Sequence, residues 1–369
     1  TAAAIMKLVE RGKLHLDDPL HRYLPGVVPD EVAKGVTIRQ LLMHTAGIFE
    51  YTAIPEFEAL ATQALPRDRL VELIAGAPPS FQPGKAQAYS NSGFLLLGLV
   101  VEKVSGKPWG RYIEDVIFPL AGMRDSRASW NAQVVPRLAT GYEFDDERGL
   151  RRAPHHEPEW IHGNGGLRST ARDMTQWMQA LHGGKVLGAD AYREMTTPGT
   201  LADGTKLRYG LGIVVGQPLL GHPVLRHGGT FPGYTGYTAY LPAHELAISV
   251  LVNTNHPNLD EDAIASEIVE HLLGDRAAEP GGAPFTAGDS VGRYRGNVLR
   301  SKRAVEVGVD AEGRLTAAIP EWGEEPRPLV HLGDDQFTAG WLDYQFLRKD
   351  GAVVSVRRVS SDTNILFER

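Results

Sequence analysis

The chain has 369 residues, which is enough for two domains that each bury a core. Its 38 lysines and arginines against 45 aspartates and glutamates give a net charge of −7, and no basic run indicates a nucleic-acid-binding surface. The absence of cysteine excludes disulfides, thiol nucleophiles and cysteine-ligated metals, and the longest apolar run, residues 93–101, is too short to span a bilayer.

The first residues predict a helix that is already in progress. Ile5, Leu8 and Val9 recur at helical spacing, and Gly12 stands where a helix C-terminal cap belongs. Neither an initiator methionine nor a capping residue precedes Thr1. We therefore expect the numbering to start inside a structural element.

Four further segments predict helices, because apolar residues at helical spacing are bounded by start and stop signals. Thr37 is placed to cap the first of them, Gly106 ends the second, and Thr170 with Asp173 forms a capping box before the third. These helices are expected at residues 38–44, 91–104, 171–181 and 259–273.

The pattern changes after residue 207 to short apolar segments rich in β-branched and aromatic residues, separated by turn signals. Such a run predicts an antiparallel meander. Its strands are expected at residues 208–216, 224–229, 236–242 and 245–253.

Glycine, proline and alanine dominate residues 276–289, which predicts a linker. Beyond it, short strand patterns separated by turn signals such as Asp350-Gly351 predict a small antiparallel barrel or sandwich. The sequence therefore predicts a first domain over residues 1–275 and an all-β domain over residues 290–369.

Tyr89, Ser90 and Asn91 lie in a loop that leads directly into the apolar helix at residues 91–104. The structural interpretation is that Ser90 or Asn91 caps this helix and Tyr89 packs. The catalytic interpretation makes Tyr89 a general base, which needs a neighbouring cation to lower its pKa from about 10. Asn91 would then orient a substrate carbonyl or a catalytic amine.

His227, Gly228, Gly229 and Thr230 lie on a predicted strand. Paired glycines weaken a strand unless another backbone must come close, and a substrate bound alongside would explain them. The Thr230 N–H could then supply half of an oxyanion hole. The structural alternative is a turn at the end of the strand.

A third segment, the glycine-rich residues 163–167, precedes the Thr170 capping box. It is either a loop that only leads into the helix, or the lining of a pocket. In the second interpretation Asn164 and Gly165 contact the substrate.

Together these segments resemble motifs of the serine β-lactamase-like hydrolases, a family that holds class C β-lactamases, D-Ala-D-Ala carboxypeptidases, D-aminopeptidases and esterases. Tyr89-Ser90-Asn91 resembles the family's Y-x-N, and His227-Gly228-Gly229 resembles its K/H-x-G strand. Residues 41–48 resemble L-L-x-H-T-S-G with Ala46 in place of serine, and residues 165–174 resemble G-G-L-x-S-T-x-x-D-M.

The resemblance implies an α+β fold, with a β-lactamase/transpeptidase-like antiparallel sheet, flanking helices and the family's N-terminal strands missing. The last residues resemble the lipocalin-like C-terminal domain of some relatives. The family's nucleophile lies in S-x-x-K, and no serine of this chain has a lysine three residues later. Because the first residues resemble the sequence that follows this motif in the family, we expect the serine and lysine upstream of residue 1.

The resemblance further implies acyl-enzyme chemistry on an ester, an amide or a small D-peptide. Tyr89 would exchange protons with the expected serine and lysine, and the oxyanion would bind between the serine N–H and the Thr230 N–H. His227 stands where a lysine would be a fixed cation for a substrate carboxylate. Because histidine is mostly neutral at neutral pH, esters, amides and small peptides are favoured over β-lactams.

The rival hypothesis is a catalytically inactive relative that acts as a binding or scaffold protein, since the 369 residues hold no S-x-x-K. No cofactor is expected, and no metal, because Pro154 and Pro158 disrupt helical ligand spacing among His155, His156, Glu159 and His162. The expected partner is a small-molecule or short-peptide substrate, not a nucleic acid, and a homo-oligomer is compatible with the sequence. Nothing in the sequence indicates a compartment.

Overall fold

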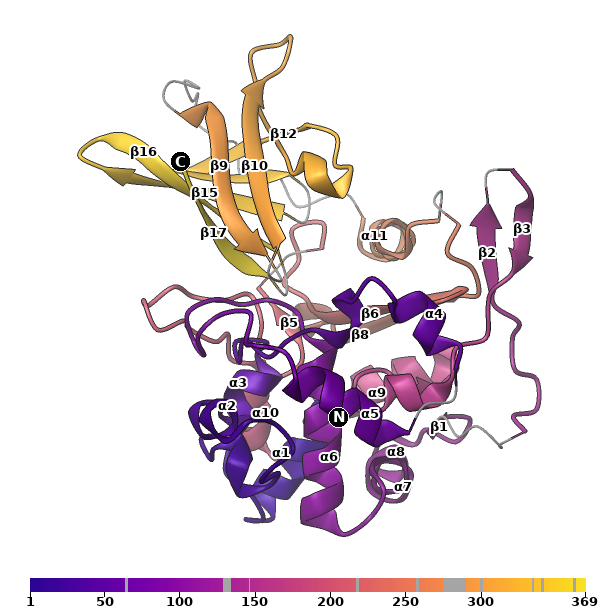
Figure 1. The fold of residues 1–369 in the computed structure, drawn as a ribbon. Coiled ribbons are helices and arrows are strands. Elements are labelled where there is room, and N and C mark those ends of the chain that lie inside the picture. Colours follow the sequence, from indigo (N-terminus) through magenta and orange to yellow (C-terminus); the bar gives the residue numbers. More distant parts are fainter. Residues whose placement is uncertain are drawn as a thin grey trace.

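The computed structural model describes residues 1–63, 66–128, 134–145, 147–216, 219–256, 259–274, 290–298, 301–333, 335–339, 342–360 and 363–369. Helices and a four-stranded sheet form one part, and a curled sheet of the C-terminal residues lies above it (Figure 1). The α+β fold class is therefore as predicted. The expected linker, residues 276–289, lies outside the described residues.

The helices are α1 (Ala2–Glu10), α2 (Asp30–Gly35), α3 (Ile38–Leu42), α4 (Phe57–Ala61), α5 (Arg67–Ala75), α6 (Asn91–Ser105), α7 (Trp109–Tyr112), α8 (Phe118–Ala121), α9 (Ala171–His182), α10 (Ala189–Thr196) and α11 (Glu261–Leu273). Two short strand pairs accompany them, β1 (Arg127–Ala128) with β4 (Leu167–Arg168), and β2 (Tyr142–Asp145) with β3 (Gly149–Arg152). No described helix has both the length and the apolar character needed to cross a membrane.

Helix α6 is the central helix of the first core. The Ser90 hydroxyl accepts a hydrogen bond from the Gly93 N–H at 3.0 Å, and Gly106 ends the helix with a φ of +71°. The structural interpretation of Ser90 as the cap is confirmed. The apolar residues of α6 are buried against α1, α3 and α7; they are Leu95, Leu96, Leu97, Val100 and Val101.

The capping box predicted at α9 forms only in part. The Thr170 hydroxyl accepts from the Asp173 N–H at 3.2 Å, as expected. The Asp173 carboxylate does not return to Thr170 but accepts from the Asp125 N–H at 2.8 Å and the Ser126 hydroxyl at 2.7 Å. This buried carboxylate therefore ties α9 to the segment that precedes β1.

The predicted meander is present as a sheet of order β5-β6-β7-β8, formed by β5 (Val214–Val215), β6 (Leu225–Phe231), β7 (Tyr234–Leu241) and β8 (Leu246–Val252). The first strand is much shorter than predicted. Gly212 has a φ of +75°, and a Cβ on Gly210 would lie 2.2 Å from the Met195 carbonyl oxygen. The chain therefore turns at these glycines and packs against α10 before β5 begins.

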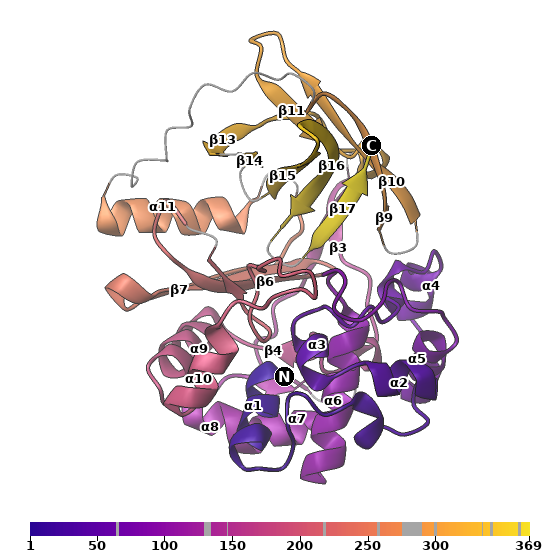
Figure 2. The same cartoon turned by 90° about the vertical axis from the view of Figure 1, so that its left-hand side faces the viewer.

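Helices cover both faces of this sheet. Figure 2 shows α9 on the side of the other helices and α11 on the opposite side, between the sheet and the C-terminal strands. Helix α11 and the sheet share a small core of their own, formed by Leu219, Val224, Tyr237, Ala239, Leu241, Ile248, Ala265 and Val269. In the described pairings β8 is an edge strand.

The C-terminal residues form a curled antiparallel sheet of order β12-β11-β10-β9-β17-β16-β15-β14-β13. Its strands are β9 (Gly292–Val298), β10 (Ser301–Val309), β11 (Leu315–Ala318), β12 (Arg327–Pro328), β13 (Val330–Gly333), β14 (Gln336–Ala339), β15 (Leu342–Lys349), β16 (Ala352–Val359) and β17 (Asn364–Glu368). Aromatic side chains such as Tyr294, Phe337 and Phe346 fill its separate core. The antiparallel, all-β character of these residues is as predicted.

The C-terminal sheet is hydrogen-bonded to the segment that carries Tyr89. The Gln87 N–H donates to the Asn364 carbonyl at 3.3 Å, and the Asn364 N–H donates to the Gln87 carbonyl at 2.9 Å. The buried Arg357 donates to the Asn364 side-chain oxygen and to Asp203, both at 3.0 Å. These bonds hold the two parts together close to the start of α6.

Helix α6 also approaches the loop at residues 162–166 very closely. A Cβ on Gly98 would lie 2.5 Å from His162 Nδ1, and a Cβ on Gly163 would lie 2.4 Å from the Phe94 carbonyl oxygen. Only glycine allows this approach, which positions Asn164 beside the N-terminal half of α6.

We predict that Gly98→Ala lowers the free energy of unfolding by about 2 kcal/mol, because overpacking outweighs the better helix propensity of alanine. Urea unfolding measures this change. Gly35→Ala is the matched control, since Gly35 ends α2 and no atom lies within 4 Å of the position that an added methyl group would take. A Gly98→Ala protein as stable as the control would contradict the close packing.

His44 is a buried hydrogen-bonding residue in the loop after α3. Its φ is +58° and its side chain accepts from the Ser90 N–H at 3.1 Å through Nδ1. Burial, with a smaller contribution from nearby His227, lowers the pKa of His44 to about 3. The ring is therefore neutral in the folded protein.

His44 makes stability depend on pH in a defined direction. Its folded pKa lies below the ordinary value of 6.5, so the unfolded chain binds the proton first as the pH falls. The contribution to stability is complete above pH 6.5 and is lost towards pH 3. Between pH 8 and pH 5 the loss is about 2 kcal/mol.

We predict that His44→Asn removes this part of the pH dependence, because asparagine accepts from Ser90, tolerates a positive φ and does not titrate. Unfolding free energies of wild type and variant at pH 8 and pH 5 provide the measurement. Equal losses in the two proteins would show that His44 does not carry the effect.

Candidate active site

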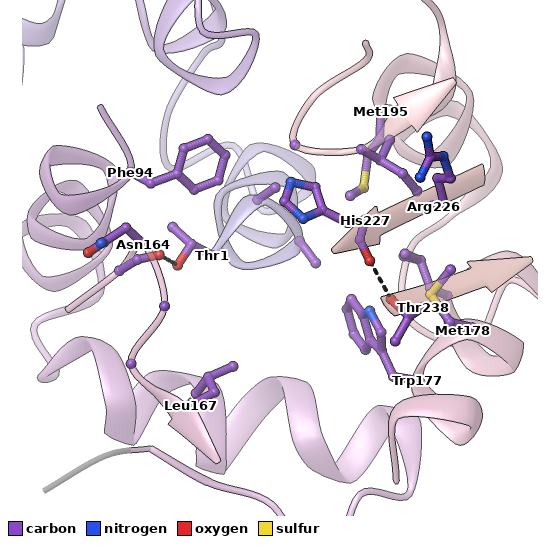
Figure 3. Close-up of a pocket in the computed structure, with 18 of the residues that line it drawn as sticks. Thr1, Phe94, Asn164, Leu167, Trp177, Met178, Met195, Arg226, His227 and Thr238 are labelled. Atoms are coloured by element: carbon purple, nitrogen blue, oxygen red, sulfur yellow. Dashed lines mark hydrogen bonds between the residues drawn. The ribbon is translucent and has the colours of Figure 1, made fainter. Parts of the chain in front are cut away.

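The candidate site is a pocket of about 250 Å³ between α6, the loop at residues 162–166 and strand β6. Figure 3 shows Thr1, Phe94 and Asn164 on one side of it and Met195, Arg226 and His227 on the other. Of the residues proposed from the sequence, Tyr89, Asn164, Gly165 and His227 line this pocket. Asn91, Gly228, Gly229 and Thr230 adjoin it without lining it.

Tyr89 is half-buried immediately before the cap of α6. Its ring centroid lies 4.3 Å from that of His44 and 6.3 Å from that of His227. The cap at Ser90 fixes the direction in which the chain enters α6, so Tyr89 and Asn91 flank a rigid helix terminus. Tyr89 therefore lies between the ring of His44, which is buried behind the pocket wall next to Phe94, and the ring of His227, which lines the pocket.

Asn91 and Asn164 are joined directly. The Asn164 side-chain nitrogen donates to the Asn91 side-chain oxygen at 3.3 Å and to the Tyr51 hydroxyl at 3.1 Å. The Tyr51 hydroxyl itself donates to the Trp160 carbonyl. This network links the Y-x-N segment to the glycine-rich loop, so the second interpretation of residues 163–167, as pocket lining, agrees with the geometry.

Strand β6 brings His227, Gly228, Gly229 and Thr230 to the site. Among the described residues β5 pairs with β6 only at Leu225 and Arg226, so β6 beyond Arg226 is paired on one side, with β7. Gly229 and Thr230 are exposed, and nothing lies within 4 Å of a Cβ built on Gly229. The strand therefore offers an open backbone edge next to the pocket.

His227 is tied to its surroundings by three hydrogen bonds. Its carbonyl oxygen accepts from the Thr238 hydroxyl at 3.1 Å, which Figure 3 marks. Its Nδ1 lies 2.6 Å from the Gly228 carbonyl oxygen, and its Nε2 lies 2.9 Å from the Tyr209 hydroxyl. The imidazole is therefore held in place from both sides.

Tyr209 was missed in the sequence analysis. It is fully buried and its hydroxyl lies between His44 Nε2, at 3.2 Å, and His227 Nε2. The only signal was its place next to Gly210 in a segment that we assigned to a strand. Tyr209 lies between the two histidines because the chain turns at Gly210 and Gly212, and sequence periodicity does not indicate this turn.

Apolar side chains form the rest of the pocket wall. They come from α9, α10 and the segment before β5, and include Trp177, Met178, Leu181, Met195 and Ile213. The Trp109 indole donates to the Thr1 hydroxyl at 2.9 Å on the opposite wall. The pocket is therefore suited to the apolar part of a small molecule or short peptide.

Two residues of the histidine-rich loop lie in the protein interior. His162 is buried and its Nε2 lies 3.1 Å from Glu102, while burial lowers the pKa of His162. Trp160 is also buried, with its indole donating to the Gln63 carbonyl at 3.0 Å. In the part of the chain that the structure describes, no group of three histidine, aspartate or glutamate residues is arranged to hold a metal ion.

Comparison with known proteins identifies relatives that match about three quarters of the chain. Penicillin-binding protein 4* of Bacillus subtilis is 28% identical over 287 residues, covering 74% of this chain and 62% of that protein. The chain thus spans less than two thirds of this relative. The crystal structure of a D-stereospecific amidohydrolase from a Streptomyces species is similar with a TM-score of 0.66 and 27% identity, covering 74% of this chain and 83% of that one.

A second solved structure covers nearly the whole chain, the C-terminal sheet included. The octameric penicillin-binding protein homologue from Pyrococcus abyssi has a TM-score of 0.63 and covers 99% of this chain and 85% of that one. At 24% identity this likeness shows the fold alone.

The family model described as Beta-lactamase matches residues 1–273. The matched residues run from the first helix to the end of α11 and include every segment that lines the pocket. The resemblance found in the motifs is confirmed, and the chain belongs to the beta-lactamase family.

Proposed function

We propose that this protein is a serine hydrolase that forms an acyl-enzyme with an ester, an amide or a small D-peptide. The observation that carries the proposal is the convergence of three motifs, distant in sequence, on one pocket: Tyr89, Asn164 and His227 line it together. Relatives that are amidases and peptidases support hydrolysis.

Tyr89 is proposed as the general base that takes the proton of the nucleophile and returns it to the leaving group. A phenol ionises near neutral pH only beside a cation, so the mechanism needs the lysine of an S-x-x-K motif near Tyr89. The 369 residues contain no such motif, and we propose that the serine and lysine are supplied from outside them. Asn91, oriented by Asn164, would hydrogen-bond the lysine amine or the substrate carbonyl.

Strand β6 is proposed to bind the substrate along its open edge. The Thr230 N–H would donate to the oxyanion together with the N–H of the nucleophile, and each such donor contributes about 3 kcal/mol. Gly228 and Gly229 would allow the substrate backbone to come close, which the empty space beside Gly229 supports.

The substrate class follows from the pocket and from His227. A volume of about 250 Å³ with apolar walls fits a small molecule or the end of a short peptide. The amidohydrolase relative is D-stereospecific, which favours D-configured amides among the candidates.

We propose a hydrolase domain at residues 1–275, a linker at residues 276–289 and an all-β domain at residues 290–369. Assembly into a homo-oligomer stays a prediction.

We predict that Tyr89→Phe lowers kcat for a p-nitrophenyl ester about a thousandfold and changes KM little, because only proton transfer is lost. Steady-state hydrolysis by the full-length natural protein gives both constants. Tyr142→Phe is the matched control, since Tyr142 is a surface tyrosine on β2. A Tyr89→Phe enzyme with wild-type kcat would exclude Tyr89 as the base.

A fluorophosphonate probe tests the nucleophile itself. We predict labelling of one serine that has a lysine three residues later, with the label found by peptide mass spectrometry. A protein that neither labels nor hydrolyses esters, amides or D-peptides would instead support the inactive binding or scaffold protein.

A further inference from the structure

A chain of hydrogen bonds, buried at His44 and Tyr209 and half-buried at His227, connects the Y-x-N segment to strand β6. It runs from the Ser90 N–H through His44 and Tyr209 to His227 and ends at the Gly228 carbonyl oxygen, with distances of 3.1, 3.2, 2.9 and 2.6 Å. We infer that His44 and Tyr209 are positioning residues that hold His227 as its neutral Nδ1–H tautomer, with Nε2 occupied by Tyr209. The consequence for substrates rests on the proposed function, whereas the tautomer does not.

The first end of the chain sets the direction of its hydrogen bonds. A backbone N–H can only donate, so His44 Nδ1 accepts from Ser90 and carries no proton. Because the buried ring is neutral, its single proton is on Nε2. His44 Nε2 therefore donates to the Tyr209 oxygen.

The His227 end of the chain gives the same direction for the hydrogen bonds, and it does so independently. A carbonyl oxygen can only accept, so the His227 nitrogen 2.6 Å from the Gly228 carbonyl carries a proton, and this nitrogen is Nδ1. In a neutral ring Nε2 is then an acceptor. Tyr209, whose oxygen already accepts from His44, donates its proton to this atom.

Burial makes this arrangement specific. Tyr209 is fully buried and His44 is 2% exposed, so neither side chain can exchange its partners here for water without an energetic penalty. A proton on His227 Nε2 would put a second donor against the Tyr209 oxygen, where the arrangement described above has an acceptor. The chain therefore opposes both the Nε2–H tautomer and the imidazolium form of His227.

This tautomer defines the substrates that suit the site. A lysine or an imidazolium on β6 would present a cation to a substrate carboxylate, but a neutral His227 with Nε2 turned to Tyr209 presents none. Substrates that are uncharged where they meet His227 should bind better than their carboxylates. Recognition along β6 then depends on backbone groups and on the apolar wall.

The test is nuclear magnetic resonance of the full chain with ¹⁵N-labelled histidine at pH 7.5. Protonated and unprotonated ring nitrogens differ in ¹⁵N shift, and couplings to the ring carbon-bound protons identify each nitrogen. We expect the Nε2–H form for His44 and the Nδ1–H form for His227. The signals of each ring are assigned by their loss in His44→Asn and in His227→Asn. An Nε2–H or doubly protonated His227 overturns the inference, whatever the protein hydrolyses.

Tyr209→Phe tests the positioning role, with the expectation that His227 becomes a mixture of tautomers. Tyr192→Phe is the matched control, because the Tyr192 hydroxyl lies 2.8 Å from His182 Nδ1 in a separate tyrosine–histidine pair. Tyr192→Phe should change the ¹⁵N signals of His182 and leave those of His227 as they are. Unchanged His227 signals in Tyr209→Phe, with the protein folded, would overturn the inference.

Kinetics add a readout that depends on the proposed function. With an active enzyme we expect Tyr209→Phe to lower kcat/KM for an uncharged ester about tenfold, the effect of one lost hydrogen bond. It should also reduce the preference for this ester over the matching carboxylate. An unchanged preference for the ester over the carboxylate overturns the inference about substrates. A protein without any hydrolytic activity contradicts the proposed function, but it does not affect the result on the tautomer.

Discussion

The candidate site depends on one buried ring, the imidazole of His44. It lies in the loop after α3, accepts from the N–H at the start of α6 and contacts Tyr209 in the segment before β5. Because burial excludes the charged form, the two ring nitrogens must take opposite roles, one accepting and one donating. Three segments that are far apart in sequence are thereby held in one arrangement, with the Tyr89 ring at 4.3 Å from the imidazole.

A second constraint acts on the same segment from the opposite side. The backbone pair between Gln87 and Asn364 lies two residues before Tyr89, and Arg357 supports it from within the C-terminal sheet. The Gln87 side chain is buried and donates to the Met43 carbonyl next to His44. The C-terminal sheet thus contributes to the order of the pocket wall although none of its described residues lines the pocket.

Much of the fold could be predicted because its signals are local. The cap at Ser90, the stop at Gly106 and the apolar face of α6 are properties of consecutive residues, as are the turns of the β5–β8 meander. The course of residues 208–213 could not be predicted in this way. The turn there is held by hydrogen bonds from the Leu211 N–H to the Met195 carbonyl and from the Gly212 N–H to the Leu42 carbonyl, and both acceptors are distant in sequence. The Asp173 carboxylate likewise left its expected partner for the N–H of Asp125, a residue 48 positions away along the chain.

The sequence by itself determined the family, the α+β class and the motif residues Tyr89, Asn164 and His227, because residue types and their spacing suffice for these. Only the tertiary structure decided how these residues are connected. Tyr209 and His44 carry no motif signal for a shared role, since their contact exists only after the chain has turned and packed. The inferred direction of each hydrogen bond there follows from the backbone groups at the two ends of the hydrogen-bond chain and from the burial of His44, neither of which a linear pattern contains.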